Sequence, residues 1–247
     1  MRSRTSGGIA ETAKTLVYAI VIALFIRTFF YEPFNIPSAS MVPTLLVGDY
    51  LFVSKFSYGY SRYSLPFGLP LIPGRLFFTP PKRGDVVVFK LPANPSIDYI
   101  KRVIGLPGDR IQMKSGILNI NDAPVTREPS ENCDVPPEEA RGAVYQRYWE
   151  TLPGGVRHCI LEMSDNASLD NTGVFVVPPD HYFMMGDNRD NSADSRDPNS
   201  GVGYVPAINL VGRAEFIFFS TNGYAHWWEP WYWPFTIRYD RLFRAIH

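Results

Sequence analysis

The chain has 247 residues, which is enough for one large domain or two small ones, and 45% of them are hydrophobic. Lys plus Arg and Asp plus Glu each number 24, so the formal net charge is zero. A chain without a basic excess lacks the electrostatic signature of nucleic-acid binding, and we expect no nucleic-acid partner.

The first predicted element is an apolar helix at residues 12–31, TAKTLVYAIVIALFIRTFFY. About 20 helical residues at ~1.5 Å each would just cross a hydrocarbon core of ~30 Å. Lys14 and Arg27 lie near the ends, where long side chains reach the headgroups. Arg2 and Arg4 predict that residues 1–11 stay in the cytoplasm and that the rest is translocated.

A cleaved secretory signal is the alternative interpretation of this segment. Such a signal ends in small residues at a cleavage site, whereas this apolar run meets Arg27, three aromatic residues and Pro33. The sequence therefore favours an uncleaved anchor at residues 12–31, with the lipid bilayer as a partner.

The next feature is a candidate nucleophile, Ser40, in PSASMVPTL at residues 37–45. Pro37 and Pro43 constrain a turn that can hold a hydroxyl in one direction. Taken alone, such a serine more often belongs to an ordinary surface turn. A G-x-S-x-G pattern is missing, which excludes an α/β-hydrolase, and the nearest histidine is His158. A catalytic serine here would need a base other than imidazole, and a neutral lysine is the usual alternative.

YIKRVIGLPGD, at residues 99–109, supplies such a lysine in Lys101. Its alternating pattern predicts a strand at residues 99–104, which Gly105 and Pro107 end. A free lysine titrates near ~10.4, so burial must lower its pKa to ~7–8 before it can take a proton from serine. Without Ser40 beside it, Lys101 would be an ordinary solvated lysine.

The rest of the chain predicts short strands and turns, since 19 Gly and 22 Pro separate runs rich in Val, Ile, Phe and Tyr. A proline-rich loop or β-ribbon extension is expected at residues 64–84, before the strand DVVVFK. RIQMKSGILNI predicts a hairpin that turns at residues 114–116. Cys133 and Cys159 lack metal-ligand spacing, so no zinc site is expected, and the sequence leaves open whether they form a disulfide.

An acidic loop, GDNRDNSADSR, occupies residues 186–196. Counted from Asp190, the EF-hand template fails, because its sixth position is Ser195 rather than Gly and its twelfth is Gly201 rather than Glu. We therefore expect no metal ion, and we interpret the loop as a self-bonded turn that holds Ser192.

Near the end of the sequence, HWWEPWYWPF contains four of the five tryptophans, Trp227, Trp228, Trp231 and Trp233. They would form either a packed aromatic lid or a surface that inserts into the lipid interface, where tryptophan is favoured.

The three motifs, in this order behind one anchor, resemble those of bacterial type I signal peptidases, membrane-bound Ser/Lys endopeptidases. PSASMVPTL resembles the nucleophile box of that family, YIKRVIGLPGD its lysine box and GDNRDNSADSR its third box. The resemblance implies Ser40 as nucleophile and Lys101 as general base. It further implies an oxyanion hole of the Ser38 hydroxyl and the Ser40 N–H, a lysine-orienting Ser192, and a supporting ion pair of Asp194 and Arg196.

The resemblance also implies a fold, a substrate and a location. The fold would be mostly β, with a catalytic domain at residues 32–107 plus 181–247 interrupted by a smaller β domain at residues 108–180. Secretory preproteins would bind as an added strand and be cut after small residues of Ala-x-Ala type, without a cofactor, on the outer (periplasmic) face of the cytoplasmic membrane. The residues expected to line the cleft are Phe34, Ile36, Pro37, Tyr99 and Ile100.

Two features depart from the better-known pattern of that family. Only one candidate span is visible where some members have two, and the spacing of Cys133 and Cys159 matches no familiar disulfide. Two alternatives stay open. The first is a specialised Ser/Lys peptidase of one secretion or conjugation system. The second is a membrane-anchored β-rich binding protein without catalysis, in which Ser40 and Lys101 never meet.

Overall fold

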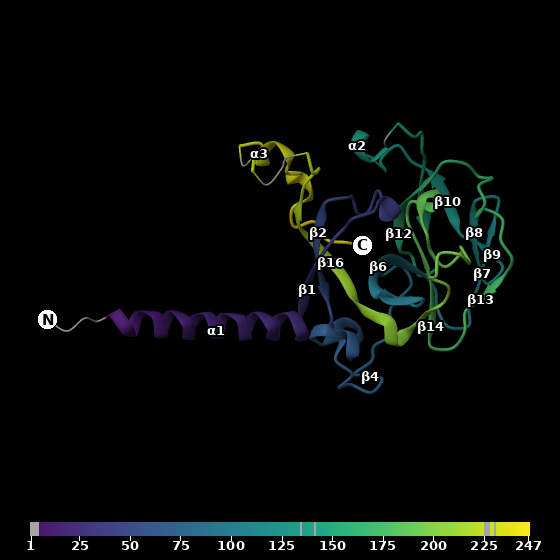
Figure 1. Ribbon diagram of the computed structural model, residues 1–247. Helices are drawn as coiled ribbons and strands as arrows, with labels where there is room; N and C mark the ends of the chain where they lie inside the picture. Colours follow the sequence, from purple (N-terminus) through teal and green to yellow (C-terminus); the bar gives the residue numbers. More distant parts are fainter. Residues whose placement is uncertain (1–4, 134, 141, 225–227, 230) are drawn as a thin grey trace.

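The computed structural model describes residues 5–133, 135–140, 142–224, 228–229 and 231–247 (Figure 1). Trp227 lies outside these residues. The first element is α1 (Thr5–Phe29), a long helix that leaves the body of the protein as a rod. Residues Ala10–Phe29 have a mean hydropathy of 1.6 and are long and apolar enough to cross a membrane. This confirms the predicted helix, although it ends before residue 31 because Tyr31 already belongs to a strand.

A seven-stranded antiparallel sheet forms the centre of the body, so the fold is mostly β, as predicted. The last strand in sequence, β16, lies in the middle of this sheet between β2 and β5. In spatial order the strands are β1 (Tyr31–Asn35), β2 (Asp49–Ser54), β16 (Leu210–Ser220), β5 (Val86–Leu91), β6 (Asn94–Gly105), β14 (His181–Met185) and β15 (Val205–Pro206).

Two further sheets are built from the residues between β6 and β14. One consists of β10 (Thr126–Pro129), β11 (Gln146–Thr151) and β12 (Arg157–Glu162). The other consists of β13 (Phe175–Val176), β7 (Arg110–Lys114), β8 (Ile117–Ile120) and β9 (Ala123–Pro124). The predicted hairpin is confirmed: β7 and β8 pair through Ser115 and Gly116, whose φ angles of +46° and +71° suit a two-residue turn.

The remaining elements are short. The proline-rich stretch is mostly loop, with one small ribbon of β3 (Tyr60–Ser61) and β4 (Arg75–Leu76). The other helices are α2 (Pro137–Ala140) and α3 (Trp233–Thr236). Single 3-10 turns lie at Ala39–Met41 (η1), Phe56–Tyr58, Arg62–Ser64, Pro66–Gly68, Arg189–Asn191 (η5), Ala207–Asn209 and Tyr239–Arg241.

The hydrophobic core does not stop at the central sheet. One cluster joins Ile104, Phe183 and Met185, from β6 and β14, with Ile111 and Met113 of β7. All five side chains are at most 1% exposed, so the central sheet and the β7–β8 hairpin share one packed core. The division into a catalytic and an inserted domain stays a prediction.

Two features that the sequence left open are visible in the structure. Cys133 and Cys159 form a disulfide, with their Cα atoms 5.8 Å apart. Trp228, Trp231 and Trp233 are 55%, 64% and 47% exposed, so these three do not form a buried lid. The segment that contains α3 projects beyond the body in the direction in which α1 leaves (Figure 1).

Candidate active site

Ser40 lies in η1, the turn that follows β1, and is 7% exposed. The next residue, Met41, is fully buried in the core and fixes the turn to the sheet. Asn188 holds the turn from the other side: its main-chain N–H donates to the Ser40 carbonyl at 3.1 Å, and its Nδ2 donates to the Ala39 carbonyl at 3.1 Å. The serine hydroxyl is therefore presented by a turn that is bonded on both sides.

Lys101 lies on β6 and meets this turn, as the sequence predicts for a functional pair. Its Nζ is 2.7 Å from Ser40 Oγ and also donates to the Ile100 carbonyl at 3.0 Å. The side chain is buried, and burial lowers the pKa of Lys101 to about 8, although the carboxylates of Asp194 and Asp187 oppose this change. A useful fraction of the amine is therefore neutral near physiological pH, within hydrogen-bond distance of the serine hydroxyl.

Two buried ion pairs lie next to Lys101. Arg102 binds Asp187 through both carboxylate oxygens, at 2.8 and 2.7 Å. Burial alone would raise the pKa of Asp187, but Arg102 holds it below its usual value. The second pair, Arg196 with Asp194 at 3.0 Å, is the ion pair that the sequence predicts. Together these pairs fix the ends of the loop that faces η1.

Gly186 is where this loop touches the nucleophile turn. A Cβ at this position would lie 2.3 Å from Ser192 Oγ and 2.5 Å from the Ser40 carbonyl oxygen. Only glycine allows the two segments to pack this closely. Its N–H donates to Asp194 Oδ2 at 3.0 Å, which ties the contact to the buried ion pair.

Two predicted residues are near the dyad without the expected bonds. Ser192 is 8% exposed, and its Oγ has no hydrogen-bond partner within the described part of the chain, so the structure contains no bond from it to Lys101. Ser38 is exposed on extended backbone at the start of η1, and its side chain does not cap that turn. The roles expected for both stay predictions.

The five residues expected to contact substrate differ in exposure. Phe34 and Ile100 are half-buried and pack against the same core cluster, and Tyr99 places its ring 5.2 Å from Lys101 Nζ. Pro37 is exposed. Ile36 is only 3% exposed and belongs to the core, so any contact of this residue with substrate would come from its backbone.

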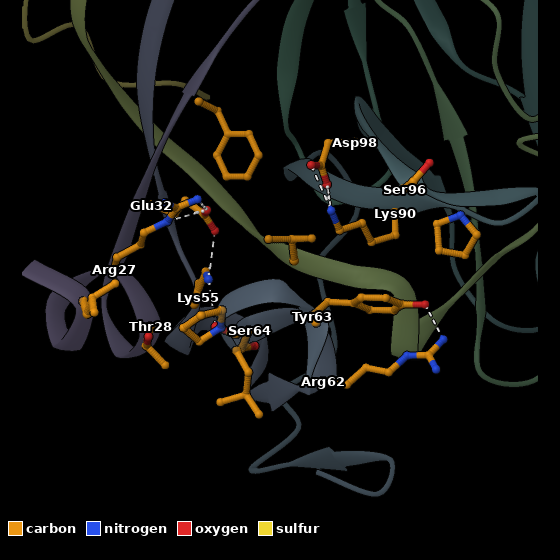
Figure 2. Close-up of a pocket in the computed structure, with 17 residues that line it drawn as sticks. Arg27, Thr28, Glu32, Lys55, Arg62, Tyr63, Ser64, Lys90, Ser96 and Asp98 are labelled. Carbon is orange, nitrogen blue, oxygen red and sulfur yellow. Dashed lines mark hydrogen bonds and ion pairs between the residues drawn. The ribbon is translucent and has the colours of Figure 1, made fainter. Parts of the chain in front are cut away.

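A cavity of about 510 Å³ lies where α1 joins the body, and Phe34 is among its lining residues (Figure 2). Lys55 and Arg27 both bind Glu32 in this wall, at 2.8 and 2.6 Å. The cavity thus connects the end of the apolar helix with one of the predicted cleft residues.

Sequence reasoning missed several residues that hold the segments around Ser40 and Lys101 in place, namely Arg102, Gly186, Asp187 and Asn188. The sequence places Asp187 in a self-bonded turn. In the structure its carboxylate instead binds Arg102 on β6, and Thr44 Oγ1 donates to it at 2.5 Å. The available signal was Arg102 itself, a charged residue inside an apolar strand, because a buried charge requires a partner.

Comparisons with known proteins agree with the motifs. A family model described as "Signal peptidase, peptidase S26" matches residues 9–219. The signal peptidase I of Rickettsia typhi is 39% identical, over 99% of this chain and 97% of that protein. That of Rickettsia conorii is 40% identical, over 98% and 97%. A crystal structure of a signal peptidase I from Enterococcus faecalis is 26% identical and covers 55% of this chain and 97% of its own, with a TM-score of 0.32.

Proposed function

This chain belongs to the signal peptidase family, peptidase S26, and we propose that Ser40 and Lys101 are the dyad with which it removes signal peptides from preproteins. The observation that carries the proposal is the 2.7 Å between Lys101 Nζ and Ser40 Oγ. This distance lies within hydrogen-bond reach, the first requirement for a nucleophile and its base.

The reaction begins when neutral Lys101 accepts the Ser40 proton while Oγ attacks the carbonyl carbon of the last signal-peptide residue. The oxyanion that forms is bound by the Ser40 N–H and the Ser38 hydroxyl. The tetrahedral intermediate then breaks, and the lysine ammonium gives its proton to the leaving amine. A water that Lys101 deprotonates next hydrolyses the acyl-enzyme, which releases the signal peptide and restores the serine.

The loop at residues 186–196 positions Ser40 and Lys101. Ser192 orients Lys101, and the pair of Asp194 and Arg196 holds the loop. Asn188 bonds the nucleophile turn directly. These residues act through the dyad and not on the substrate.

The substrate binds as an added strand, cut after a small residue of an Ala-x-Ala site. The pairing of β6 supports this mode: among the described strands, β14 pairs with β6 only at Arg102, Val103 and Gly105. Residues 94–101 therefore have a free edge on that side, and β1 is an outer strand of the same sheet. Backbone hydrogen bonds along such edges supply affinity, and pockets for alternate side chains of the substrate supply specificity. The cleft residues are Phe34, Ile36, Pro37, Tyr99 and Ile100.

The enzyme is anchored in the bacterial cytoplasmic membrane by α1, with residues 1–11 in the cytoplasm. The catalytic domain, residues 32–107 plus 181–247, then lies on the periplasmic face together with the insert at residues 108–180. The cavity between α1 and the body supports this arrangement, because a preprotein that leaves the bilayer beside the anchor meets Phe34 there.

The test is cleavage of a secretory preprotein that bears an Ala-x-Ala site, by detergent-solubilised protein, with the cut mapped by mass spectrometry. Wild type should cut after the second Ala, and Lys101→Ala should not. Lys114→Ala is the matched control, because Lys114 is an exposed lysine at the end of β7, outside the proposed cleft. Equal cleavage by the Lys101 variant would remove the lysine from the mechanism.

A further inference from the structure

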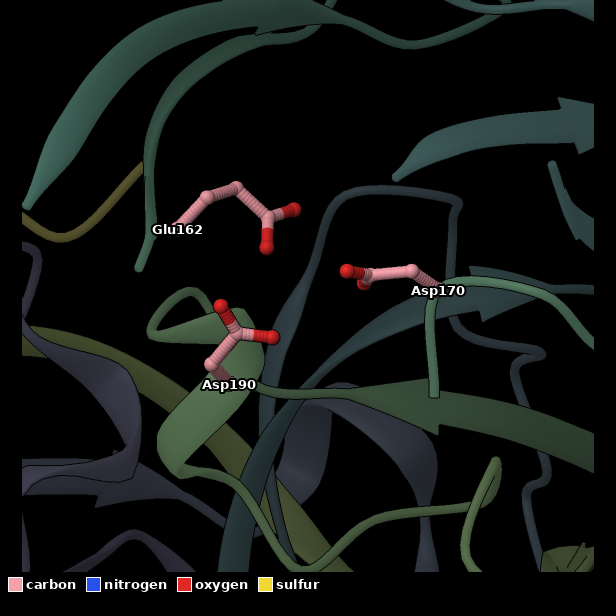
Figure 3. A group of neighbouring side chains, drawn as sticks. All are labelled: Glu162, Asp170 and Asp190. Carbon is pink, nitrogen blue, oxygen red and sulfur yellow. The ribbon is translucent and has the colours of Figure 1, made fainter. Parts of the chain in front are cut away.

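Three carboxylates outside the dyad point toward one another (Figure 3). Glu162 ends β12, Asp170 lies in the loop that follows it, and Asp190 lies in η5. One oxygen from each lies within 4.8 Å of the others. Three segments thus deliver one acidic group each to a common point.

The oxygens that meet there lack protein partners. Glu162 and Asp170 are 0% exposed. Within the described residues, both carboxylate oxygens of Glu162 and the Oδ1 atoms of Asp170 and Asp190 have no hydrogen-bond partner. The Oδ2 atoms are engaged: that of Asp170 accepts the Ala167 N–H at 2.6 Å, and that of Asp190 accepts the Met163 N–H at 2.7 Å. These bonds fix the two aspartates while their other oxygens stay available to a ligand.

The local charge balance points to a positive ligand. Two arginines influence this region, but Arg189 forms its ion pair with Glu150, and Arg196 forms its pair with Asp194. A buried carboxylate without a bonded partner is costly, and a bound cation would remove that cost.

We propose that Glu162, Asp170 and Asp190 bind a hard divalent cation, with Ca²⁺ preferred. Carboxylate oxygens are the ligands that such ions take, and because the three oxygens lie within 4.8 Å of one another, one ion can contact all of them. Ca²⁺ accepts several protein carboxylates, whereas Mg²⁺ usually keeps several waters and is bound through one or two. The failed match to the EF-hand template excludes a calcium site made by the acidic loop alone. The proposed site is different, because only Asp190 comes from that loop.

A cation at this point would connect the loop at residues 186–196 to the sheet of β12. Asp190 is two residues from Asn188, which bonds the nucleophile turn, and two residues from Ser192. The site is therefore structural: it stabilises the segment that positions the dyad and takes no part in proton transfer.

The test uses full-length protein in detergent, stripped with EDTA and dialysed, in calorimetric titration with CaCl2 and in thermal unfolding. Saturating Ca²⁺ should raise the Tm of wild type by about 5 °C, with a smaller rise in the same concentration of MgCl2. Glu162→Gln should fold, bind Ca²⁺ at least about 10-fold more weakly and lose the rise in Tm. Glu128→Gln, which alters an exposed carboxylate of β10 in the same three-stranded sheet, should respond as wild type does.

Asp190→Asn is the second variant, because an amide oxygen still accepts the Met163 N–H while one charge is removed. It should also weaken Ca²⁺ binding. No binding heat and no shift in Tm of wild type up to about 10 mM CaCl2 would overturn the proposal, since structural sites in exported modules bind at about 0.1–1 mM or tighter. An equal response of wild type and both variants would overturn it as well, because it would show a general salt effect.

Discussion

Lys101 Nζ and Ser40 Oγ lie 2.7 Å apart although 61 residues separate them in sequence. The lysine is 3% exposed, and this burial has two effects. It lowers the pKa of the amine beside the hydroxyl to about 8, so that part of it is neutral near physiological pH, and it leaves the charged form poorly solvated. Removal of the Lys101 amine should therefore abolish activity but raise the stability of the fold.

The pH dependence of activity should report the lysine. The active form is the neutral amine, and the pKa of Lys101 is lowered to about 8. Below that pH, kcat/KM for a preprotein should fall about tenfold per pH unit, and above it the rate should level off. Initial rates between pH 6 and 10 measure this. A rate that is constant across the range would contradict a lysine base.

Lys101→Met should abolish cleavage and raise the Tm at pH 7. An unfolded lysine titrates near 10.5 and the folded one at about 8, so the unfolded state binds more protons between these values. Burial of Lys101 therefore lowers the free energy of unfolding of wild type by at most about 3 kcal/mol. This loss is complete below pH 8 and disappears above about pH 11.

Lys55→Met is the matched control for that change. Lys55 is equally buried, at 3% exposed, but its Nζ binds Glu32 at 2.8 Å and the Ser64 carbonyl at 2.9 Å. Its removal leaves these groups with fewer partners, so the Tm should fall. Thermal unfolding in detergent at pH 7 compares both variants, and a lower Tm of Lys101→Met would show that burial of the lysine carries no cost.

Gly186→Ala should disrupt the site. The added Cβ would lie 2.3 Å from Ser192 Oγ and 2.5 Å from the Ser40 carbonyl oxygen, so the loop must move away from the nucleophile turn. We expect a loss of kcat of about 100-fold or more. Gly173→Ala is the control, since a Cβ there meets nothing within 4 Å, and it should keep wild-type rates. Similar rates for both variants would mean that the 186–196 loop does not set the dyad geometry.

The exposed tryptophans should contact lipid. In vesicles that contain brominated phospholipid, the fluorescence of wild type should be quenched strongly, because bromine quenches only indoles within contact range. Replacing Trp231 and Trp233 by Phe should reduce the quenching, with Trp228 as a remaining exposed indole. Replacing Trp149 by Phe, on β11, should leave it unchanged. If the double variant is quenched as strongly as wild type, this surface does not insert.

The sequence predicts best those features that local pattern or chemistry determines. The length of the apolar run predicted α1, the turn residues predicted the β7–β8 hairpin, and the lack of a nearby histidine pointed to Lys101. The motifs also gave the pair of Asp194 and Arg196, which are two residues apart.

Features that depend on long-range contact could not be predicted in the same way. Asp187 lies in an acidic loop, and nothing nearby in sequence indicates that its partner is Arg102, 85 residues earlier. The disulfide stayed open because pairing depends on the distance between two loops, not on spacing in the chain. The group of Glu162, Asp170 and Asp190 fits no contiguous template, because its members come from three segments.

The position of β16 has a consequence for biosynthesis. Ser40 lies between β1 and β2, which pair with each other, and Lys101 lies on β6, which pairs with β5. β16 joins these two pairs as the strand between them. A nascent chain already contains Ser40 and Lys101 long before residues 210–220 have been made. Until β16 is inserted, the β1–β2 and β5–β6 hairpins lack the strand that joins them in the sheet. We therefore expect Ser40 and Lys101 to meet only after the C-terminal part of the chain has been made.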